Sequence, residues 1–251
     1  CWATPRRGDS VIPARPKGPP SPTMTDRTVL LTGASGGIGS AVAEAFAAEG
    51  WRTVLCARSE AALDSTAQAV SAAGGTPVVR PLDVRDENEV FLALSETVED
   101  ELDVLVPAAA VMPHAPGARP LDEERHDDAR DVLDVNAYGV FAAIREGLQF
   151  MPPDGRVLVP SGSVARDAEP GMGTYAASKA AAEAFARGFA VDADQHVGVV
   201  DPGIVATDLT GGKGRDPADV ADMFRWAALE CPAEDLDGEV LGLREWKRAT
   251  R

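Results

Sequence analysis

The sequence predicts an α/β fold: one domain on a doubly wound parallel sheet of about seven strands, with helices on both faces. Short runs rich in Val and Leu alternate with Ala-rich helical stretches from residue 26 onward. This alternation is typical of right-handed βαβ units in a parallel sheet. The chain has 251 residues, and from about residue 24 onward no internal boundary is visible, which favours a single large domain.

The elements follow from the lengths and residue types of these runs. Short runs of mostly apolar residues suit buried strands, and longer stretches rich in alanine suit helices. We expect strands at 29–31, 53–56, 77–82, 103–106, 156–159, 197–200 and, at the edge of the sheet, 239–242. We expect helices at about 38–49, 60–73, 86–100, 122–150, 174–192 and 217–229.

The first 23 residues differ from the rest of the chain. Residues 1–23 hold six prolines and no apolar periodicity, so they bury too little surface to offset the entropy of ordering. We expect a disordered, Pro-rich, basic extension there, without the apolar centre of a secretion signal. The folded domain is expected over 24–251. Met24 directly precedes its first strand, which favours an upstream extension over a functional basic arm.

The charge of the chain limits its partners. The formal net charge is -16, and the extension carries four basic residues and one acid, so the domain alone stands at -19. So acidic a chain repels nucleic acid and anionic membranes, and no apolar run of about 18 residues predicts a membrane span. The basic residues include only four lysines. This bias fits a salt-rich cytosol or a GC-rich genome equally well.

A glycine-rich turn joins the first strand to the first helix. It reads Thr-Gly-Ala-Ser-Gly-Gly-Ile-Gly at 32–39. Glycines let the backbone turn tightly and approach a pyrophosphate, which then lies at the helix N-terminus. Its position after an apolar strand and before a helix indicates a Rossmann-type dinucleotide site. The cofactor-binding candidates in the turn are Gly33, Ser35, Gly37, Ile38 and Gly39.

The glycine spacing and four later motifs resemble the short-chain dehydrogenase/reductase family over nearly all of 26–245. The motifs are Asp83-Val84 after the third strand, Asn136, a Tyr175-x-x-x-Lys179 pair, and Pro202-Gly203-x-x-x-Thr207. The resemblance implies that Asp83 and Val84 meet the adenine and that Pro202, Gly203, Val205 and Thr207 hold the nicotinamide. It also implies that Lys179 binds the nicotinamide ribose and that Asn136 holds a water in a proton relay.

The Tyr175/Lys179 pair has a direct chemical reading. Residues four apart lie on one face of a helix. An ammonium beside a phenol favours the phenolate and is expected to lower the pKa of Tyr175. Tyr175 can then act as general acid or base at a carbonyl oxygen while hydride is transferred.

The end of the second strand bears on the choice of cofactor. An acid there binds a ribose 2′-hydroxyl, whereas a basic residue accepts a 2′-phosphate. The position of the acid in the family is Ala57 here, followed by Arg58 and Ser59. We therefore favour NADP(H), with NAD(H) as the alternative.

Two motifs depart from the family. Its Asn-Asn-Ala-Gly is replaced by Pro-Ala-Ala-Ala at 107–110, so that Ala109 lies at the cofactor; this means weaker cofactor binding or a differently supported strand end. The catalytic serine commonly lies thirteen residues before the tyrosine, where this chain has Gly162. Ser163 is the preferred donor, because Gly-Ser-Val resembles several members, and Ser161 is the alternative.

These observations favour an NADP(H)-dependent oxidoreductase that interconverts a small-molecule carbonyl and alcohol. The alternative is a catalytically impaired sensor or scaffold of the same fold. A Rossmann methyltransferase is disfavoured because it has no use for the Tyr/Lys pair. The resemblance also implies a substrate lid at 208–214 and a homodimer or homotetramer through 122–150 and 176–190. The three scattered cysteines favour the cytoplasm. The histidines, His114, His126 and His196, lack metal-ligand spacing.

Overall fold

The computed structural model describes residues 27–112, 119–167 and 169–251. The extension predicted at 1–23 and the loop residue His114 lie outside these ranges. Seven parallel strands form one sheet in the order β3-β2-β1-β4-β5-β6-β7. The predicted doubly wound fold is confirmed. The strands are β1 (Thr28–Thr32), β2 (Arg52–Ala57), β3 (Thr76–Pro81), β4 (Val104–Pro107), β5 (Arg156–Pro160), β6 (His196–Asp201) and β7 (Val240–Gly242).

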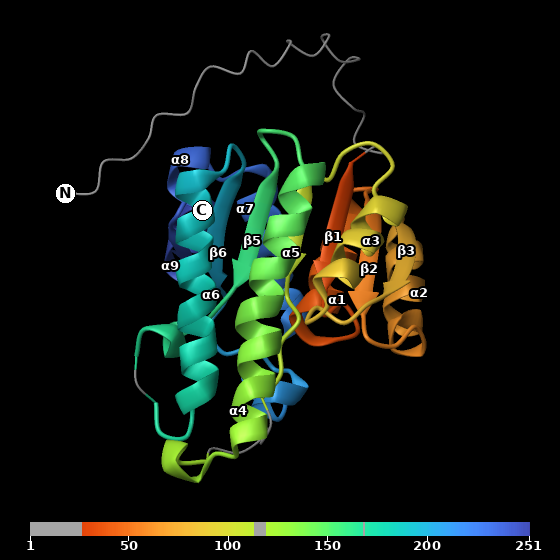
Figure 1. Cartoon of the computed structure of the whole chain (residues 1–251). Helices are drawn as coiled ribbons and strands as arrows, with labels where there is room; N and C mark the ends of the chain where they lie inside the picture. Colours follow the sequence, from red (N-terminus) through yellow and green to blue (C-terminus); the bar gives the residue numbers. More distant parts are fainter. Residues whose placement is uncertain (1–26, 113–118, 168) are drawn as a thin grey trace, which may run out of the picture.

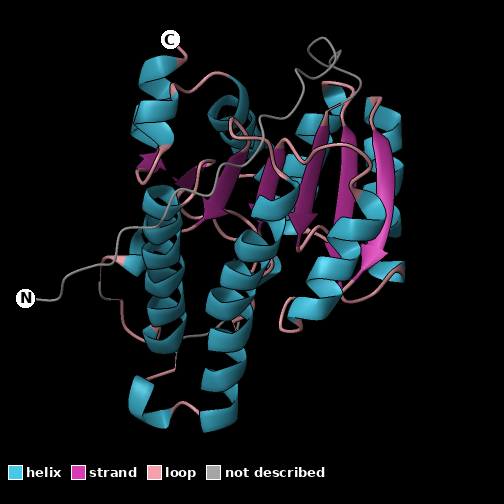
Figure 2. Ribbon diagram, turned by 45° about the horizontal axis from the view of Figure 1, so that its top comes forward, coloured by secondary structure: helices cyan, strands magenta, loops and turns pink. Residues whose placement is uncertain are grey.

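Helices cover both faces of the sheet (Figures 1 and 2). One apolar layer packs α1 (Gly37–Ala48), α2 (Asp64–Ala73) and α7 (Pro217–Leu229) on the sheet. The other packs α3 (Glu87–Thr97), α5 (Gly139–Gly147) and α6 (Gly173–Asp192) on the opposite face. The central strands β1, β2, β4, β5 and β6 are buried on both sides, which is why they read as continuous apolar runs rather than as alternating ones, whereas the edge strand β3 is only partly buried.

The strand order reverses between β1 and β4, which pair directly. In sheets of this kind a ligand binds where the order reverses, beyond the carboxyl ends of the strands. The pairing of β4 with β5 ends at Leu105 and Val157, while the pairing of β5 with β6 continues to Pro160. The sheet therefore opens at this edge, beside the glycine turn.

The helix predicted at 122–150 is interrupted, so that prediction was wrong in detail. A 3-10 turn η3 (Leu121–Glu123) is followed by extended backbone at Glu124 and Arg125 before α4 (His126–Leu133) begins. A π-helical turn η4 (Asp134–Tyr138) then leads into α5 and a 3-10 turn η5 (Leu148–Phe150). One extra residue in a turn often marks a functional position, and Asn136 occupies it here.

Other boundaries shift by a few residues. The second helix starts as a 3-10 turn η2 (Ala61–Leu63), and the third spans 87–97 rather than 86–100. Two short helices, α8 (Ala233–Leu236) and α9 (Leu243–Ala249), were not predicted. Two further 3-10 turns are η6 (Ser163–Ala165) and η7 (Asp208–Thr210). In the ranges that the structure describes, no helix is long and apolar enough to cross a membrane.

Candidate functional site

The glycine turn leaves the start of α1 open. Gly36 precedes α1 and has no side chain to cap the first N–H groups, which therefore remain available to an anion. A Cβ added at Gly36 meets nothing within 4 Å, whereas one at Gly39 lies 2.3 Å from the Gly33 carbonyl oxygen. The turn is thus packed tightly on its inner side and open on its outer side. The Ile38 side chain packs toward the core instead.

A hollow of about 120 Å³ lies beside this turn at the carboxyl ends of the strands. It brings together segments that are far apart in the sequence: the turn after β1, the end of β2, the end of β3 and the end of β4. Six of the predicted cofactor residues line it, namely Gly33, Ser35, Arg58, Asp83, Val84 and Ala109. Ser59 is exposed next to Arg58. The hollow thus lies where sheets of this kind bind a dinucleotide.

Charged residues at the hollow are joined by ion pairs that centre on Arg85. Asp83 accepts hydrogen bonds from Arg85, with Nε at 3.0 Å and Nη2 at 2.5 Å, and Arg85 also contacts Asp131 at 2.6 Å. Arg85, and more weakly Arg58, hold the pKa of the Asp83 carboxyl below its usual value. Asp83 therefore stays charged. The sequence interpretation missed Arg85, although its position two residues after Asp83 was a usable signal.

The end of β4 is supported without the asparagines of the family. The Ala109 N–H donates to Thr32 Oγ1 at 3.2 Å, and the Ala108 N–H donates to the Val106 carbonyl at 2.9 Å. Gly33 lies so close that a Cβ there would stand 2.7 Å from the Ala109 Cα. Of the two explanations for the replaced motif, this geometry favours a differently supported strand end.

Asn136 joins the β4 loop to α6. Its Oδ1 accepts from the Val111 N–H at 2.8 Å, and its Nδ2 donates to the Val111 carbonyl at 2.9 Å and to Ser178 Oγ at 3.1 Å. Ser178 in turn donates to the Tyr175 carbonyl at 2.7 Å. Asn136 is fully buried, so these bonds fix the helix that carries the tyrosine. Ser178 is a further residue of the site that the sequence interpretation missed.

Tyr175 and Lys179 lie together on α6, with the ammonium 5.8 Å from the centre of the phenol ring. Lys179 Nζ donates to the Pro160 carbonyl at 3.1 Å. Burial raises the pKa of Tyr175, so the expected lowering of this pKa is wrong for this structure. Burial also lowers the pKa of Lys179 to about 8, an effect that the nearby Glu183 charge opposes.

The two candidate serines lie in different environments. Ser161 is buried, and its Oγ donates to Glu183 Oε1 at 2.7 Å. Ser163 begins η6 and is exposed. A hydroxyl held by a buried carboxylate is not free to meet a substrate oxygen, so the structure favours Ser163.

The segment after β6 is held at its base. Pro202 and Val205 are buried, and Gly203 has a positive φ of 72°. The Thr210 hydroxyl donates to the Val205 carbonyl at 2.7 Å and accepts from the Thr207 N–H at 3.0 Å. The predicted lid at 208–214 therefore leaves the sheet from a fixed support.

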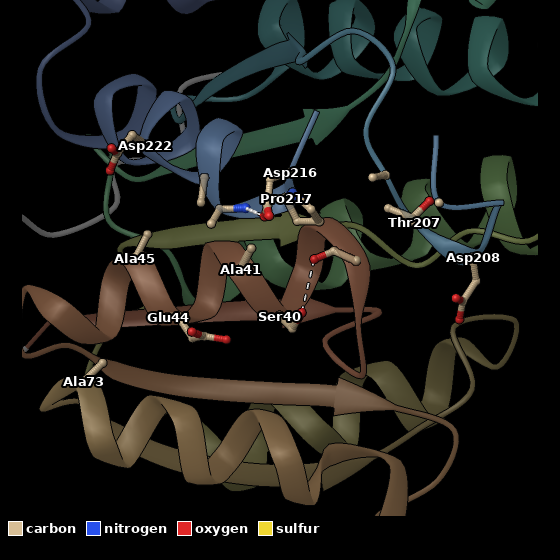
Figure 3. A pocket seen from close by; sticks show the side chains of 15 residues that line it. Ser40, Ala41, Glu44, Ala45, Ala73, Thr207, Asp208, Asp216, Pro217 and Asp222 are labelled. Atoms are coloured by element: carbon tan, nitrogen blue, oxygen red, sulfur yellow. Dashed lines mark hydrogen bonds between the residues drawn. The ribbon is translucent and has the colours of Figure 1, made fainter. Parts of the chain in front are cut away.

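A second hollow, of about 630 Å³, lies between α1 and the start of α7 (Figure 3). It begins at Gly37 and Thr207, two predicted cofactor residues, and Figure 3 shows Ser40 and Ala41 facing it from α1. No arginine or lysine is found among the described residues that line it, which include four acids, Glu44, Asp208, Asp216 and Asp222. These acids repel phosphate, so only its Gly37/Thr207 end suits a dinucleotide.

Among the described residues, no group of three or more His, Cys, Asp or Glu side chains could hold a metal ion. The described side chains offer a phenol, an ammonium, an amide and a hydroxyl, and the hollow of about 120 Å³ lies at the carboxyl ends of the strands.

Comparison with known proteins agrees with this geometry. A family model described as short chain dehydrogenase matches residues 27–218. The chain is 30% identical over 241 residues to a 3-oxoacyl-[acyl-carrier-protein] reductase from Synechocystis, covering 88% of this chain and 96% of that protein. It is 34% identical to the glycine betaine reductase ATRR of Emericella nidulans over 90% of this chain, and spans only 19% of that longer protein.

Solved structures share the fold. A dehydrogenase/reductase from Sinorhizobium meliloti matches with a TM-score of 0.77 and 30% identity, covering 87% of this chain and 96% of that one. A Thermococcus sibiricus alcohol dehydrogenase complexed with 5-hydroxy-NADP has a TM-score of 0.76 and 28% identity, covering 86% and 95%. A 3-oxoacyl-[acyl-carrier protein] reductase with bound NAD from Brucella melitensis has a TM-score of 0.75 and 26% identity, covering 86% and 89%.

Proposed function

The chain belongs to the short-chain dehydrogenase family, and from this membership we propose that it interconverts a carbonyl and an alcohol with NADP(H). It is an oxidoreductase that acts with NAD(P). The observation that carries the finer proposal is that Tyr175, Lys179 and Asn136 come together at α6. Asn136 also bonds Val111, which lines the hollow together with Arg58.

The residues present fit a dinucleotide. Space is open over Gly36, and the first N–H groups of α1 have no side-chain cap, which suits a pyrophosphate. The hollow of about 120 Å³ is lined by Asp83 and Val84 for the adenine and by Ala109 near the ribose. Pro202, Gly203, Val205 and Thr207 would hold the nicotinamide end. When bound, the nicotinamide supplies or accepts the hydride.

The side chains of the chain then manage the proton and the charge. Tyr175 donates its phenolic proton to the substrate oxygen in the reduction and removes it in the oxidation. Ser163 donates a hydrogen bond to the same oxygen, where negative charge develops. Lys179, positively charged beside the ring, stabilises the phenolate and contacts the nicotinamide ribose. Asn136 holds α6 in place and supports the water of the proton relay.

The preference for NADP(H) rests on Arg58. Relatives in solved structures bind either an NADP analogue or NAD, so the family alone leaves the choice open. Arg58 is exposed at the hollow, near Asp83, and a guanidinium there binds a 2′-phosphate. The alternative of a catalytically impaired sensor or scaffold finds no support in the comparisons.

An activity screen tests the reaction. Purified protein with NADPH is given aldehydes, ketones and 3-oxoacyl thioesters at low and at molar salt, and loss of NADPH absorbance is followed. We expect turnover with at least one class. NADPH that binds without being oxidised by any of them would contradict the proposal for this panel. Faster turnover at molar salt would favour the salt-rich reading of the charge bias, and equal turnover the genomic one.

Replacing Arg58 tests the phosphate contact. We expect Arg58→Ala to raise the KM for NADPH about tenfold or more and to leave the KM for NADH nearly unchanged, because only NADPH carries the 2′-phosphate. Arg130→Ala removes an arginine that is 77% exposed on α4 and is the control. Equal effects of Arg58→Ala on the two cofactors would refute the role of Arg58.

We also propose a cytoplasmic location and a homodimer or homotetramer. Cys56 and Cys231 are buried free thiols, and burial raises the pKa of Cys56 to about 12, as suits a reducing compartment. We propose that the subunits contact each other through the exposed aromatic side chains of η4 and α6, Tyr138 and Phe185.

A further inference from the structure

Glu183 is a buried acid that the mechanism above does not use. It lies on α6, one helical turn after Lys179, and it is 2% exposed. A carboxylate almost never lies this deep unless charged or hydrogen-bonding partners compensate for lost water. Its partners therefore indicate its role.

Three side chains meet the Glu183 carboxylate. Ser161 Oγ donates to Oε1 at 2.7 Å, and Arg166 Nη1 lies 3.3 Å from the same oxygen. Arg187 Nη1 lies 3.8 Å from Oε2. Ser161 follows β5 directly and Arg166 follows η6. One carboxylate thus joins α6 to both ends of the short segment that carries Ser163.

Three more contacts extend this network. Arg166 also pairs with Asp201, whose Oδ1 accepts from the Gly203 N–H at 3.0 Å. Lys179 donates to the carbonyl of Pro160, the residue before Ser161. The contacts therefore join the three segments that hold the proposed serine, the Tyr/Lys pair and the Pro-Gly turn.

We propose that Glu183 is a positioning residue whose carboxylate holds the Ser163 segment against α6 and keeps Lys179 cationic beside Tyr175. This inference rests on the proposed function, in which Lys179 works as an ammonium. Glu183 reaches the reaction through Lys179 and the Ser163 segment and has no direct contact with the substrate.

The charges around Lys179 determine the direction of the effect. Tyr175, Glu183 and Arg187 face this region from α6, Arg166 from the loop after η6, and Asp201 from the end of β6. Burial lowers the pKa of Lys179 to about 8, and Glu183 is the charge that opposes this. Both arginines carry the same sign as Lys179, so they cannot replace Glu183. Without the carboxylate, Lys179 should lose its proton at a lower pH.

Lysine-selective NMR measures this directly, because the chain has only four lysines: Lys17, Lys179, Lys213 and Lys247. The protein is labelled with 13C and 15N at lysine, the signal of Lys179 is assigned with Lys179→Arg, and its titration is followed without added cofactor. We expect a midpoint near pH 8 in the wild type. In Glu183→Gln we expect it roughly one pH unit lower, the shift typical of losing one nearby opposite charge.

Asp192→Asn is the matched control. It removes the same charge from the same helix at an exposed position more than three turns beyond Lys179, and we expect the Lys179 midpoint to stay unchanged. Glu183→Asp retains the charge and should keep the midpoint near that of the wild type. The pH above which kcat/KM for NADPH declines should move with the NMR midpoint in each variant.

A double variant is used in case Glu183→Gln does not fold. Ser161→Val with Glu183→Leu replaces the buried polar pair by an apolar one, an exchange that folded proteins often tolerate. We expect the same downward shift of the Lys179 midpoint. An unchanged midpoint in either folded variant, or an equal shift in Asp192→Asn, would overturn the positioning role. If the Lys179 midpoint shifts in the variants as expected but the wild type oxidises no NADPH, the proposed function is contradicted instead.

Discussion

Individual polar side chains in this protein are placed by buried hydrogen bonds that short motifs do not show. Asn136 was recognised from its motif, but its link to Tyr175 passes through Ser178, which no pattern singled out. Likewise, the two candidate serines differ because Glu183 accepts a hydrogen bond from Ser161, a contact that no sequence motif shows. The residue types of the site were therefore predictable from the sequence, but the hydrogen-bond partners and the separate role of each residue were not.

The serines give a prediction at this scale. We expect Ser163→Ala to lower kcat about 10²-fold, because it removes a hydrogen bond to the developing charge. Ser161→Ala should lower kcat less than tenfold and reduce the free energy of unfolding by about 1.5–3 kcal/mol, since it removes a buried bond to a charged group. Steady-state kinetics and urea unfolding measure both effects. The reverse order of the kcat losses would assign the catalytic role to Ser161.

The pKa values of the Tyr175/Lys179 pair are a second property that the sequence pattern did not predict. The spacing of four predicted correctly that Lys179 and Tyr175 share a face of α6. It did not reveal how deep the pair lies, and burial reverses the expected direction for the pKa of Tyr175. Depth depends on the packing of α6 against the sheet, which a local pattern does not contain.

At the scale of elements, apolar periodicity predicted the alternation of strands and helices and missed the irregular turns. All seven strands were expected, because each contains a short apolar run. The break before α4 was missed, because the acidic stretch around Glu124 reads as a continuous solvated helix. Helices α8 and α9 span four and seven residues, too few for a clear period.

The close approach of β1 and β4 can be tested by adding one methyl group. Gly33→Ala introduces a Cβ 2.7 Å from Ala109 backbone at a φ of 68°. We expect it to cost ~1–2 kcal/mol for the backbone conformation and a further ~1–3 kcal/mol for overpacking. Urea unfolding measures the loss.

Gly50→Ala is the matched control. Gly50 also has a positive φ, of 80°, but an added Cβ meets nothing within 4 Å. It should show only the conformational cost. Equal losses for the two variants would mean that the β4 end moves aside freely, against the tight support inferred from the Thr32 bond to Ala109.

At the scale of the whole molecule, an aromatic face lies on the outside of α5 and α6. Phe141 stacks with Phe185 at 5.2 Å and with Phe189 at 5.7 Å, and its ring lies 6.0 Å from Tyr138. Tyr138 and Phe185 remain 40% and 36% exposed. The resemblance to the family implied that these helices form the assembly surface, and the exposed rings support that proposal.

A charge placed on this face tests the assembly. We expect the wild type to sediment as a dimer or tetramer and Phe185→Glu to shift it toward the monomer, because an ion cannot be buried there without a partner. Val191→Glu alters an 84% exposed position near the end of the same helix and should leave the assembly intact. A wild type that is monomeric at micromolar concentration would contradict the proposal.

The net charge of -16 also belongs to this scale. It excludes general attraction to polyanions, but not one anionic ligand held by neutral N–H groups and a single arginine. The larger hollow is lined by four carboxylates and disfavours an anion, whereas the smaller hollow is lined by Arg58 and suits one.

The proposed function depends most directly on proton transfer by Tyr175 in an NADPH-dependent reduction. The chain has only two tyrosines, so Tyr138→Phe is a natural control for Tyr175→Phe. NADPH consumption is compared among the wild type and both variants, with a carbonyl that the wild type reduces. We expect a 10²- to 10⁴-fold lower kcat in Tyr175→Phe, with NADPH binding retained and Tyr138→Phe close to the wild type. Undiminished turnover in Tyr175→Phe would contradict the proposed function.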